Sequence, residues 1–198
     1  MKRMICVALL LSLVAVGMVG CGKKSETPTP VRTDLWGFET EAEVAAFDND
    51  NTDAVLAYDQ VTVFKGIGSI KITPGGKPET KIAAKLPVSA YDPWKKSKVF
   101  VVNLYMEEGM DPAINTVFLG MADLGPDGDS WDWVSGSFYK INSPVTGWNK
   151  CPIGLLPSMK NLDSTHQYKL YIGFYNEDEM KITTALANVF FVDAIYIE

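Results

Sequence analysis

Two tryptophans and two neighbouring acids offer the clearest recognition chemistry in this sequence. Trp131 and Trp133 alternate along a predicted strand and so share one face of it, and Asp129 and Asp132 lie beside them. Sugars present an apolar face of C–H groups rimmed by hydroxyls, so their sites combine flat aromatic rings with amide and carboxylate groups. These residues therefore indicate a candidate sugar-binding surface. The alternative is that Trp133 belongs to the core.

Side chains that could carry catalysis do not form a recognisable set. His166 is the only histidine and falls in the polar turn 163–167, and Cys151 is expected to be a small buried hydrophobe. The acids fall mostly in loops, and none forms a pair suited to the separation of about 5–10 Å that glycosidases use. The sequence contains no Gly-x-Ser-x-Gly, phosphate-loop, Cys-x-x-Cys or His-Glu-x-x-His motif. We therefore expect a protein that is not an enzyme.

The composition suits one globular domain with an acidic surface. The chain has 198 residues, of which 47% are hydrophobic and 11% aromatic, and its net charge is −6. Residues 1–20 contain two of the 18 basic residues and none of the 24 acids, so the charge without them is −8. Such a surface repels phosphates, and we expect no nucleic-acid partner.

The N-terminal segment has the organisation of an export signal. Lys2 and Arg3 precede the apolar run 4–16, which is short for a spanning helix of about 20 residues. The run ends at Met18-Val19-Gly20-Cys21, which resembles a bacterial lipobox and predicts lipidation of Cys21. The alternatives are a plain signal peptide or an uncleaved anchor, with Cys21 incidental.

The residue that follows the cysteine bears on the destination. Gly22 is not the Asp that is typical of inner-membrane retention, so we expect a lipid-anchored protein of the cell envelope. The outer membrane or the cell surface is favoured if the host has two membranes. The predicted organisation is a signal peptide at 1–20, a lipidated cysteine with a flexible linker at 21–33, and one domain at 34–198.

The domain reads as all-β. From Leu35 onward the apolar pattern has a period of two, and turn residues interrupt it every 8–15 residues, which predicts an antiparallel β-sandwich. The one predicted helix is Thr40–Phe47, where Thr40 and Glu43 have the spacing of a capping box. The predicted strands are Asp34–Glu39, Val55–Val63, Gly68–Thr73, Lys81–Val88, Lys98–Met106, Asn115–Asp123, Trp131–Tyr139, Asn149–Gly154, Tyr168–Tyr175 and Ala187–Ile197.

Two predicted strands have one purely apolar face, which we expect to pack between the sheets. The opposite faces carry tyrosines and polar residues and are candidate binding surfaces. The apolar faces consist of Phe100, Val102, Leu104 and Met106 in one strand, and of Leu170, Ile172 and Phe174 in the other.

Four short motifs occur in a characteristic order. They are Leu35-Trp36-Gly37-Phe38-Glu39, Gly66-Ile67-Gly68-Ser69-Ile70-Lys71-Ile72, Gly147-Trp148-Asn149-Lys150 and Val189-Phe190-Phe191-Val192-Asp193-Ala194-Ile195-Tyr196-Ile197. The set resembles the galactose-binding-domain-like jelly-roll family, which includes many bacterial carbohydrate-binding modules. The resemblance covers residues 34–198 and implies a jelly-roll β-sandwich, a fold that hosts many functions.

The resemblance also implies a structural Ca²⁺. In the family, the Glu of the first strand and the Asp of the last hold the ion with backbone carbonyls of a loop, which points to Glu39, Asp193 and carbonyls near 65–68. The alternative is that both acids end strands in solvent or accept hydrogen bonds from turns. We expect the acidic stretches 48–53 and 123–129 to be solvated loops.

In the same family the concave sheet binds glycans. The resemblance therefore implies a non-catalytic protein that binds a polysaccharide or oligosaccharide, near the membrane and near a partner glycoside hydrolase or transporter. The alternative is a structural or protein-interaction lipoprotein without a sugar site. We expect Trp36, Trp94 and Trp148 to be structural. The candidate ligand-binding residues are Asn103, Tyr105, Trp131, Trp133, Tyr171 and Tyr175.

Overall fold

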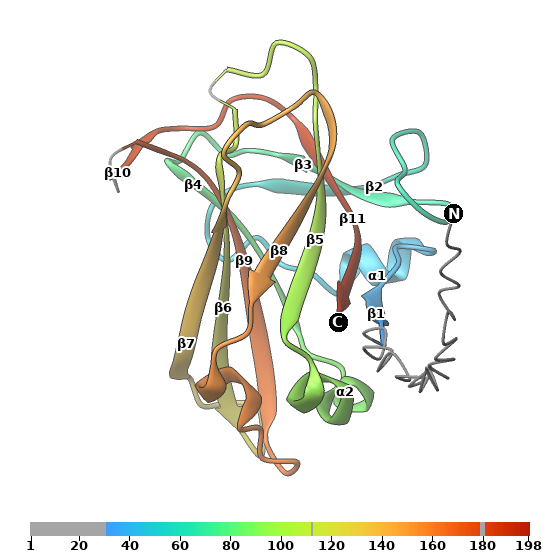
Figure 1. The fold of residues 1–198 in the computed structure, drawn as a ribbon, viewed down its shortest axis with the longest axis vertical. Coiled ribbons are helices and arrows are strands. Elements are labelled where there is room, and N and C mark those ends of the chain that lie inside the picture. Colours follow the sequence, from blue (N-terminus) through green and yellow to red (C-terminus); the bar gives the residue numbers. More distant parts are fainter. Residues whose placement is uncertain (1–30, 112, 179–180) are drawn as a thin grey trace, which may run out of the picture.

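Two antiparallel sheets pack face to face, as the alternation of apolar residues predicts (Figure 1). The computed structural model describes residues 31–111, 113–178 and 181–198, so the predicted signal peptide and Cys21 lie outside the described residues. One sheet contains β1 (Thr33–Trp36), β2 (Val55–Asp59), β3 (Ser69–Thr73), β5 (Val99–Met106), β8 (Gly147–Gly154) and β11 (Phe190–Ile197). The other contains β4 (Glu79–Lys85), β6 (Thr116–Gly125), β7 (Asp132–Lys140), β9 (Gln167–Asp178) and β10 (Lys181–Thr184).

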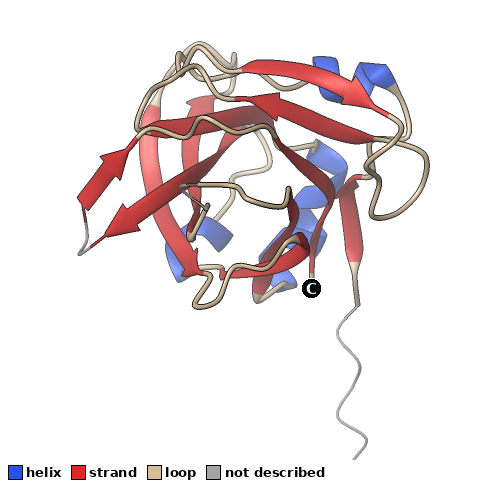
Figure 2. Ribbon diagram, turned by 90° about the horizontal axis from the view of Figure 1, so that it is seen from above, coloured by secondary structure: helices blue, strands red, loops and turns tan. Residues whose placement is uncertain are grey.

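The strand order follows from the pairing. In the six-stranded sheet the order is β2-β3-β11-β5-β8, and β1 pairs with β11. In the five-stranded sheet the order is β10-β9-β6-β7, and β4 pairs with the free side of β9. Seen from above, the strands of both sheets curve around a shared interior (Figure 2). The predicted antiparallel β-sandwich is confirmed.

The core lies between the two sheets. All seven residues of the predicted apolar faces of β5 and β9 are buried, as the period of two requires. Phe174 of β9 meets Phe190 of β11 across the interior, with ring centroids 4.9 Å apart. Burying each such side chain contributes about 1.5–3 kcal/mol, so this interface supplies much of the stability of a domain in which the one described cysteine, Cys151, is free.

The helices are short, and one of them is absent from the sequence-based prediction. The predicted helix is α1 (Glu41–Ala45), but the side chain of Thr40 makes no capping hydrogen bond, and the carboxylate of Glu43 accepts the N–H of Glu39. The second helix, α2 (Tyr91–Lys96), is missed because it spans less than two turns and carries Pro93 in its first turn, where proline is tolerated.

Helix α2 is held by its buried aromatic residues. Tyr91 and Trp94 are three positions apart, so both face the core, and the Trp94 indole donates a hydrogen bond to the carbonyl of Met159, 2.7 Å away. Met159 belongs to the 3₁₀ turn at Pro157–Lys160, and a second 3₁₀ turn, at Val88–Ala90, leads into α2. Within the described ranges no helix is long and apolar enough to cross a membrane.

Candidate ligand-binding site

A groove on the outer face of the five-stranded sheet collects exposed aromatic rings and charged groups. Its volume is about 230 Å³. Trp131 and Trp133 are 58% and 49% exposed, so their rings are available to a ligand. We call it the aromatic groove; it is lined by Asp50, Lys81, Phe118, Trp131, Trp133 and Tyr171.

Two rings of the aromatic groove are nearly parallel, and we call this pair the platform. Phe118 of β6 and Trp133 of β7 are parallel to within 4°, with centroids 6.2 Å apart. Gly120 and Gly136 face each other on the same two strands. A Cβ atom at Gly120 would lie 2.5 Å from the Trp133 ring, and one at Gly136 would lie 2.6 Å from the Phe118 ring. The absence of side chains at both positions therefore lets the two rings lie against the sheet.

A bulge in β7 decides which residues share the platform face. Trp133 pairs with Ala122 of β6, whereas Ser135 pairs with Met121, so the register shifts by one residue between them. Met121 is a core residue, and Ser135 therefore faces inward with it. A strand with an uninterrupted period of two would place Ser135 on the face of Trp133, but the bulge interrupts the period and turns Ser135 to the other face.

The third large ring is held by a hydrogen bond. The indole N–H of Trp131 donates to the hydroxyl of Tyr171 on β9, 2.7 Å away. The Tyr171 side chain is only 7% exposed, which gives Trp131 a fixed partner. The centroids of Trp131 and Tyr171 lie 6.2 Å and 6.4 Å from that of Trp133, at interplanar angles of 32° and 43°.

Charged side chains border the platform on the β4 side. The Lys81 ammonium contacts the carboxylate of Glu79 and lies 3.6 Å from that of Asp50. Burial lowers the pKa of Lys81, but the two carboxylates outweigh it and hold that pKa above its usual value. Further along, Lys169 pairs with Asp48 at 2.6 Å. The groove thus offers hydrogen-bond acceptors and donors beside an apolar surface.

Three of the predicted ligand-binding residues come together in the groove, and a fourth lies near it. Trp131, Trp133 and Tyr171 line the groove. Tyr175 points to the same outer face, with its ring centroid 6.4 Å from that of Phe118, but it is buried and does not line the groove. Burial raises the pKa of its hydroxyl.

The other two predicted residues are on the opposite sheet, so the prediction of one surface is wrong. Asn103 and Tyr105 belong to β5, which pairs with β11 and β8. Asn103 is buried and donates to the carbonyl of Ala194 at 2.9 Å, which is a structural role. Tyr105 packs edge-on against Trp148 and Phe191 at interplanar angles of 62° and 79°. The alternation of residues defines the faces of a strand but not the sheet it joins.

Three groove residues were not predicted from the sequence. Phe118 could have been found, because Phe118, Gly120 and Ala122 alternate with core residues and therefore face outward. No pattern in the sequence indicated that Asp50 and Lys81 would line the groove. Asp50 reaches the groove from a loop that precedes β2, and only the folded structure brings that loop to β4.

The loop that carries Trp131 is tied to a neighbouring turn by an ion pair. The His166 ring lies 2.9 Å from the carboxylate of Asp123, at the end of β6. The same carboxylate accepts the N–H of Gly125, and the Gln167 amide donates to the carbonyl of Pro126. These contacts fix the start of the loop that leads to Trp131.

The two predicted calcium ligands lie at the same loop, but they make different contacts with it. The Asp193 carboxylate is fully buried and accepts the N–H groups of Phe64 and Lys65 at 2.8 Å and 2.9 Å. Burial raises its pKa, and the charge of Glu39 adds to that rise. Glu39 reaches the backbone at Gly66, where a Cβ atom would lie 2.0 Å from its oxygen.

Two carboxylates at one loop suit a divalent cation, although the loop offers Asp193 backbone N–H groups. Among the described residues, no group of three or more His, Cys, Asp and Glu side chains is placed to hold a metal. Any further ligands would therefore be backbone carbonyls, side-chain amide or hydroxyl oxygens, or water. The calcium site stays a prediction.

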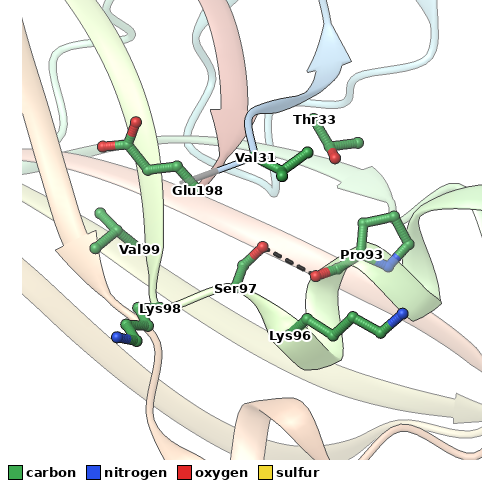
Figure 3. Close-up of a pocket in the computed structure, with 8 residues that line it drawn as sticks. All are labelled: Val31, Thr33, Pro93, Lys96, Ser97, Lys98, Val99 and Glu198. Carbon is green, nitrogen blue, oxygen red and sulfur yellow. Dashed lines mark hydrogen bonds between the residues drawn. The ribbon is translucent and has the colours of Figure 1, made fainter. Parts of the chain in front are cut away.

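A larger cavity lies elsewhere and has a different character. It has a volume of about 610 Å³ and lies between the first described residues, α2 and the C-terminal residue. Figure 3 shows the Ser97 hydroxyl donating to the Pro93 carbonyl, while Lys96, Lys98 and Glu198 point in different directions. The charged side chains drawn there do not converge, so we place the candidate site in the aromatic groove.

Comparison with known proteins defines the fold class. No model of a known protein family matches the chain, and no curated protein matches it. Solved structures do match. One of these structures is 19% identical to this chain in sequence and matches it with a TM-score of 0.52. It was determined to explain the promiscuous specificity of carbohydrate-binding modules from the β-sandwich superfamily. The match covers 84% of this chain and 62% of that one, so the chain spans less than two thirds of that protein.

Two further matches cover nearly the whole of the matched chain. A family 11 carbohydrate-binding module from Clostridium thermocellum, in complex with a β-1,3-1,4-mixed-linked tetrasaccharide, is 15% identical with a TM-score of 0.53, over 84% of this chain and 94% of that chain. A family 11 module of a cellulosomal cellulase of Clostridium thermocellum is 14% identical with a TM-score of 0.53, over 85% and 95%. The chain therefore has the β-sandwich jelly-roll fold found in carbohydrate-binding modules, as its motifs predict.

The ion pair of His166 and Asp123 predicts a pH-dependent stability. The hydrogen bond to Asp123 raises the pKa of His166. Burial raises the pKa of Asp123, but the hydrogen bonds from His166 and from the Gly125 N–H, together with the charge of His166, outweigh it and lower that pKa. The stabilisation is lost as the pH falls through the lowered pKa of Asp123, and also as it rises through the raised pKa of His166.

Thermal unfolding of the wild type and of His166→Gln across a range of pH measures this effect. We expect the Tm of the wild type to exceed that of His166→Gln by the largest amount between pH 3.8 and pH 6.5, the ordinary pKa values of the two groups. The difference in Tm should disappear at alkaline pH. A difference in Tm that is the same at every pH would contradict the ion pair.

The calcium prediction is tested by melting the protein in EDTA and in excess calcium chloride. We expect calcium to raise the Tm of the wild type, because an ion that binds only the folded state stabilises it. Glu39→Gln should abolish the rise, and it keeps the hydrogen bonds of the buried Asp193 carboxylate. An equal Tm for the wild type in both solutions would remove the site.

Proposed function

We propose that this protein binds a polysaccharide or oligosaccharide non-catalytically through the aromatic groove. The observation that carries the proposal is the pair of parallel, surface-facing rings of Phe118 and Trp133 beside the charged groups of Asp50 and Lys81. A pyranose ring has an apolar face and polar edges, so it can stack on the platform while its hydroxyls reach the charged groups.

The ring geometry favours a flat ligand over a compact cation. A cage for a quaternary ammonium group surrounds the cation with ring faces. Here Phe118 and Trp133 are parallel, and Trp131 is inclined to Trp133 by only 32°. The centroids of Phe118 and Trp133 are only 6.2 Å apart, which leaves too little room for a cation between the two ring faces, and this supports a ligand that stacks on the exposed rings.

The comparisons support the same class of ligand. The family 11 module from Clostridium thermocellum, which matches with a TM-score of 0.53, is in complex with a mixed-linked tetrasaccharide. That ligand belongs to that protein, and a likeness at 15% identity concerns the fold. It makes soluble β-glucans a sensible part of the first panel of ligands.

For the location, we propose a lipid anchor at Cys21 and a place in the cell envelope. The apolar run 4–16, the Met18-Val19-Gly20-Cys21 motif and Gly22 support this, and they favour the outer membrane or the cell surface in a host with two membranes. The polar linker would hold the domain off the bilayer, where it could keep glycan near a partner glycoside hydrolase or transporter.

Sugar binding is tested with Trp133→Ala, and Trp148→Ala serves as the matched control. Trp133 lies on the platform, whereas Trp148 packs edge-on against Tyr105 on the other sheet. We expect Trp133→Ala to weaken binding by about 2 kcal/mol, or roughly 30-fold, because it removes a central aromatic contact. Trp148→Ala should bind as the wild type does. Isothermal titration with a panel of soluble plant, algal and host polysaccharides measures both.

Two results would contradict the proposal. Equal losses in both variants would place the ligand outside the aromatic groove. No binding of the wild type to any member of the panel would favour the alternative, a structural or protein-interaction lipoprotein that keeps the jelly roll without a sugar site.

The anchor is tested by labelling cells with a clickable fatty acid. The wild type should incorporate the label and fractionate with membranes, and Cys21→Ala should do neither. Cys151→Ala is the control for nonspecific acylation, because Cys151 is buried in the described domain. A label that persists in Cys21→Ala would overturn the anchor.

A further inference from the structure

The loop that precedes β2 is anchored to β4 beside the aromatic groove. Asp48 and Ala83 exchange two backbone hydrogen bonds of 2.8 Å. Thr52 is buried, and its hydroxyl donates to the carbonyl of Asn49 at 2.7 Å and accepts the N–H of Lys81 at 3.2 Å. The ends of the loop 48–53 are therefore part of the sheet structure.

The backbone between these anchors has an unusual conformation. Asp50, Asn51 and Asp53 have φ angles of 40°, 60° and 58°, in the left-handed region where Asn and Asp are the most tolerated residues after glycine. Lys77 stabilises this turn by donating to the carbonyl of Asn51 at 2.5 Å, whereas its ion pair with Asp53, at 2.8 Å, is exposed and contributes little. The loop is thus pre-organised by contacts that lie outside the groove.

This conformation directs the Asp50 side chain into the groove. Asp50 and Lys81 both line it, and each side chain is 24% exposed. The Lys81 ammonium is shared with Glu79 and lies 3.6 Å from the Asp50 carboxylate, longer than a close hydrogen bond. The oxygens of Asp50 therefore keep lone pairs that can accept hydrogen bonds from a ligand.

The balance of charge in this part of the groove is negative. Two carboxylates, Asp50 and Glu79, surround one ammonium, and the neighbouring Lys169 is neutralised by Asp48. A carboxylate on the ligand would meet repulsion here and would leave Asp50 without a donor, whereas a hydroxyl would donate to it.

We infer that Asp50 is a specificity-determining residue of the aromatic groove. It accepts hydrogen bonds from sugar hydroxyls at the edge of the platform, and it selects uncharged sugar units over uronic acids. The inference rests on the proposed function and adds to it the polar group that distinguishes one class of sugar from another. Lys81 is a positioning residue, because it restrains the Asp50 carboxylate from within the protein.

The test compares Asp50→Asn with Asp53→Asn. Both positions belong to the same loop and both have positive φ, but the Asp53 side chain is 68% exposed and does not line the groove. Asparagine tolerates the left-handed region, so both variants are expected to fold, and thermal unfolding verifies this. The ligands are the neutral polysaccharide that binds best in the panel and the same polymer after partial carboxymethylation.

We expect the wild type to prefer the neutral polymer and Asp50→Asn to bind it about tenfold more weakly, because a charge-assisted hydrogen bond becomes a neutral one. The ratio of the affinities for the neutral and the carboxymethylated polymer should be smaller in Asp50→Asn than in the wild type. In Asp53→Asn this ratio should equal that of the wild type. For the wild type, added salt should strengthen binding of the carboxymethylated polymer, because it screens the repulsion.

Three results would overturn the inference. They are equal binding of both polymers by the wild type, unchanged affinity in Asp50→Asn, and a panel in which only acidic polysaccharides bind. In the third case, a loss of binding in Trp133→Ala would retain the aromatic groove and reject only the role of Asp50. If no polysaccharide binds at all, the proposed function fails, and the inference fails with it.

Discussion

The close approach of two aromatic rings to the backbone of β6 and β7 is the constraint on which the candidate site depends. Gly120 and Gly136 pair across these strands, and a side chain at either would collide with the ring of Phe118 or Trp133. Any larger residue would displace the rings from their present positions against the sheet. The platform is therefore encoded by missing side chains as much as by the aromatic residues themselves.

The two outer faces of the sandwich use aromatic residues in opposite ways. On the six-stranded sheet, Tyr105 packs edge-on against Trp148 and Phe191, the arrangement that aromatic rings adopt when they stabilise one another. On the five-stranded sheet, Trp131 and Trp133 are 58% and 49% exposed. The rings of the first group cover one another within the protein, and those of the second leave apolar area for a ligand. This difference carries the functional argument more directly than the number of aromatic residues does.

The sequence predicted the sandwich well because its inward-facing residues alternate without interruption along β5 and β9. The sequence did not predict the parts of the site that depend on contacts between residues far apart in the chain. Period two could not show that Asn103 and Tyr105 join the other sheet, nor that a bulge next to Val134 reverses the faces of β7. Asp50 precedes β2 in the chain and reaches the groove only through the pairing of its loop with Ala83, which no sequence pattern announces.

The most direct test of glycan binding in the aromatic groove is an NMR titration that follows the indole N–H signals of the five tryptophans while a soluble glycan is added. Trp131 and Trp133 line the groove, Trp36 and Trp94 are buried in the core, and Trp148 lies on the other sheet. Binding in the aromatic groove predicts saturable shifts for Trp131 and Trp133 and unchanged signals for the other three. A ligand that shifts Trp148 and leaves Trp133 unchanged would contradict it.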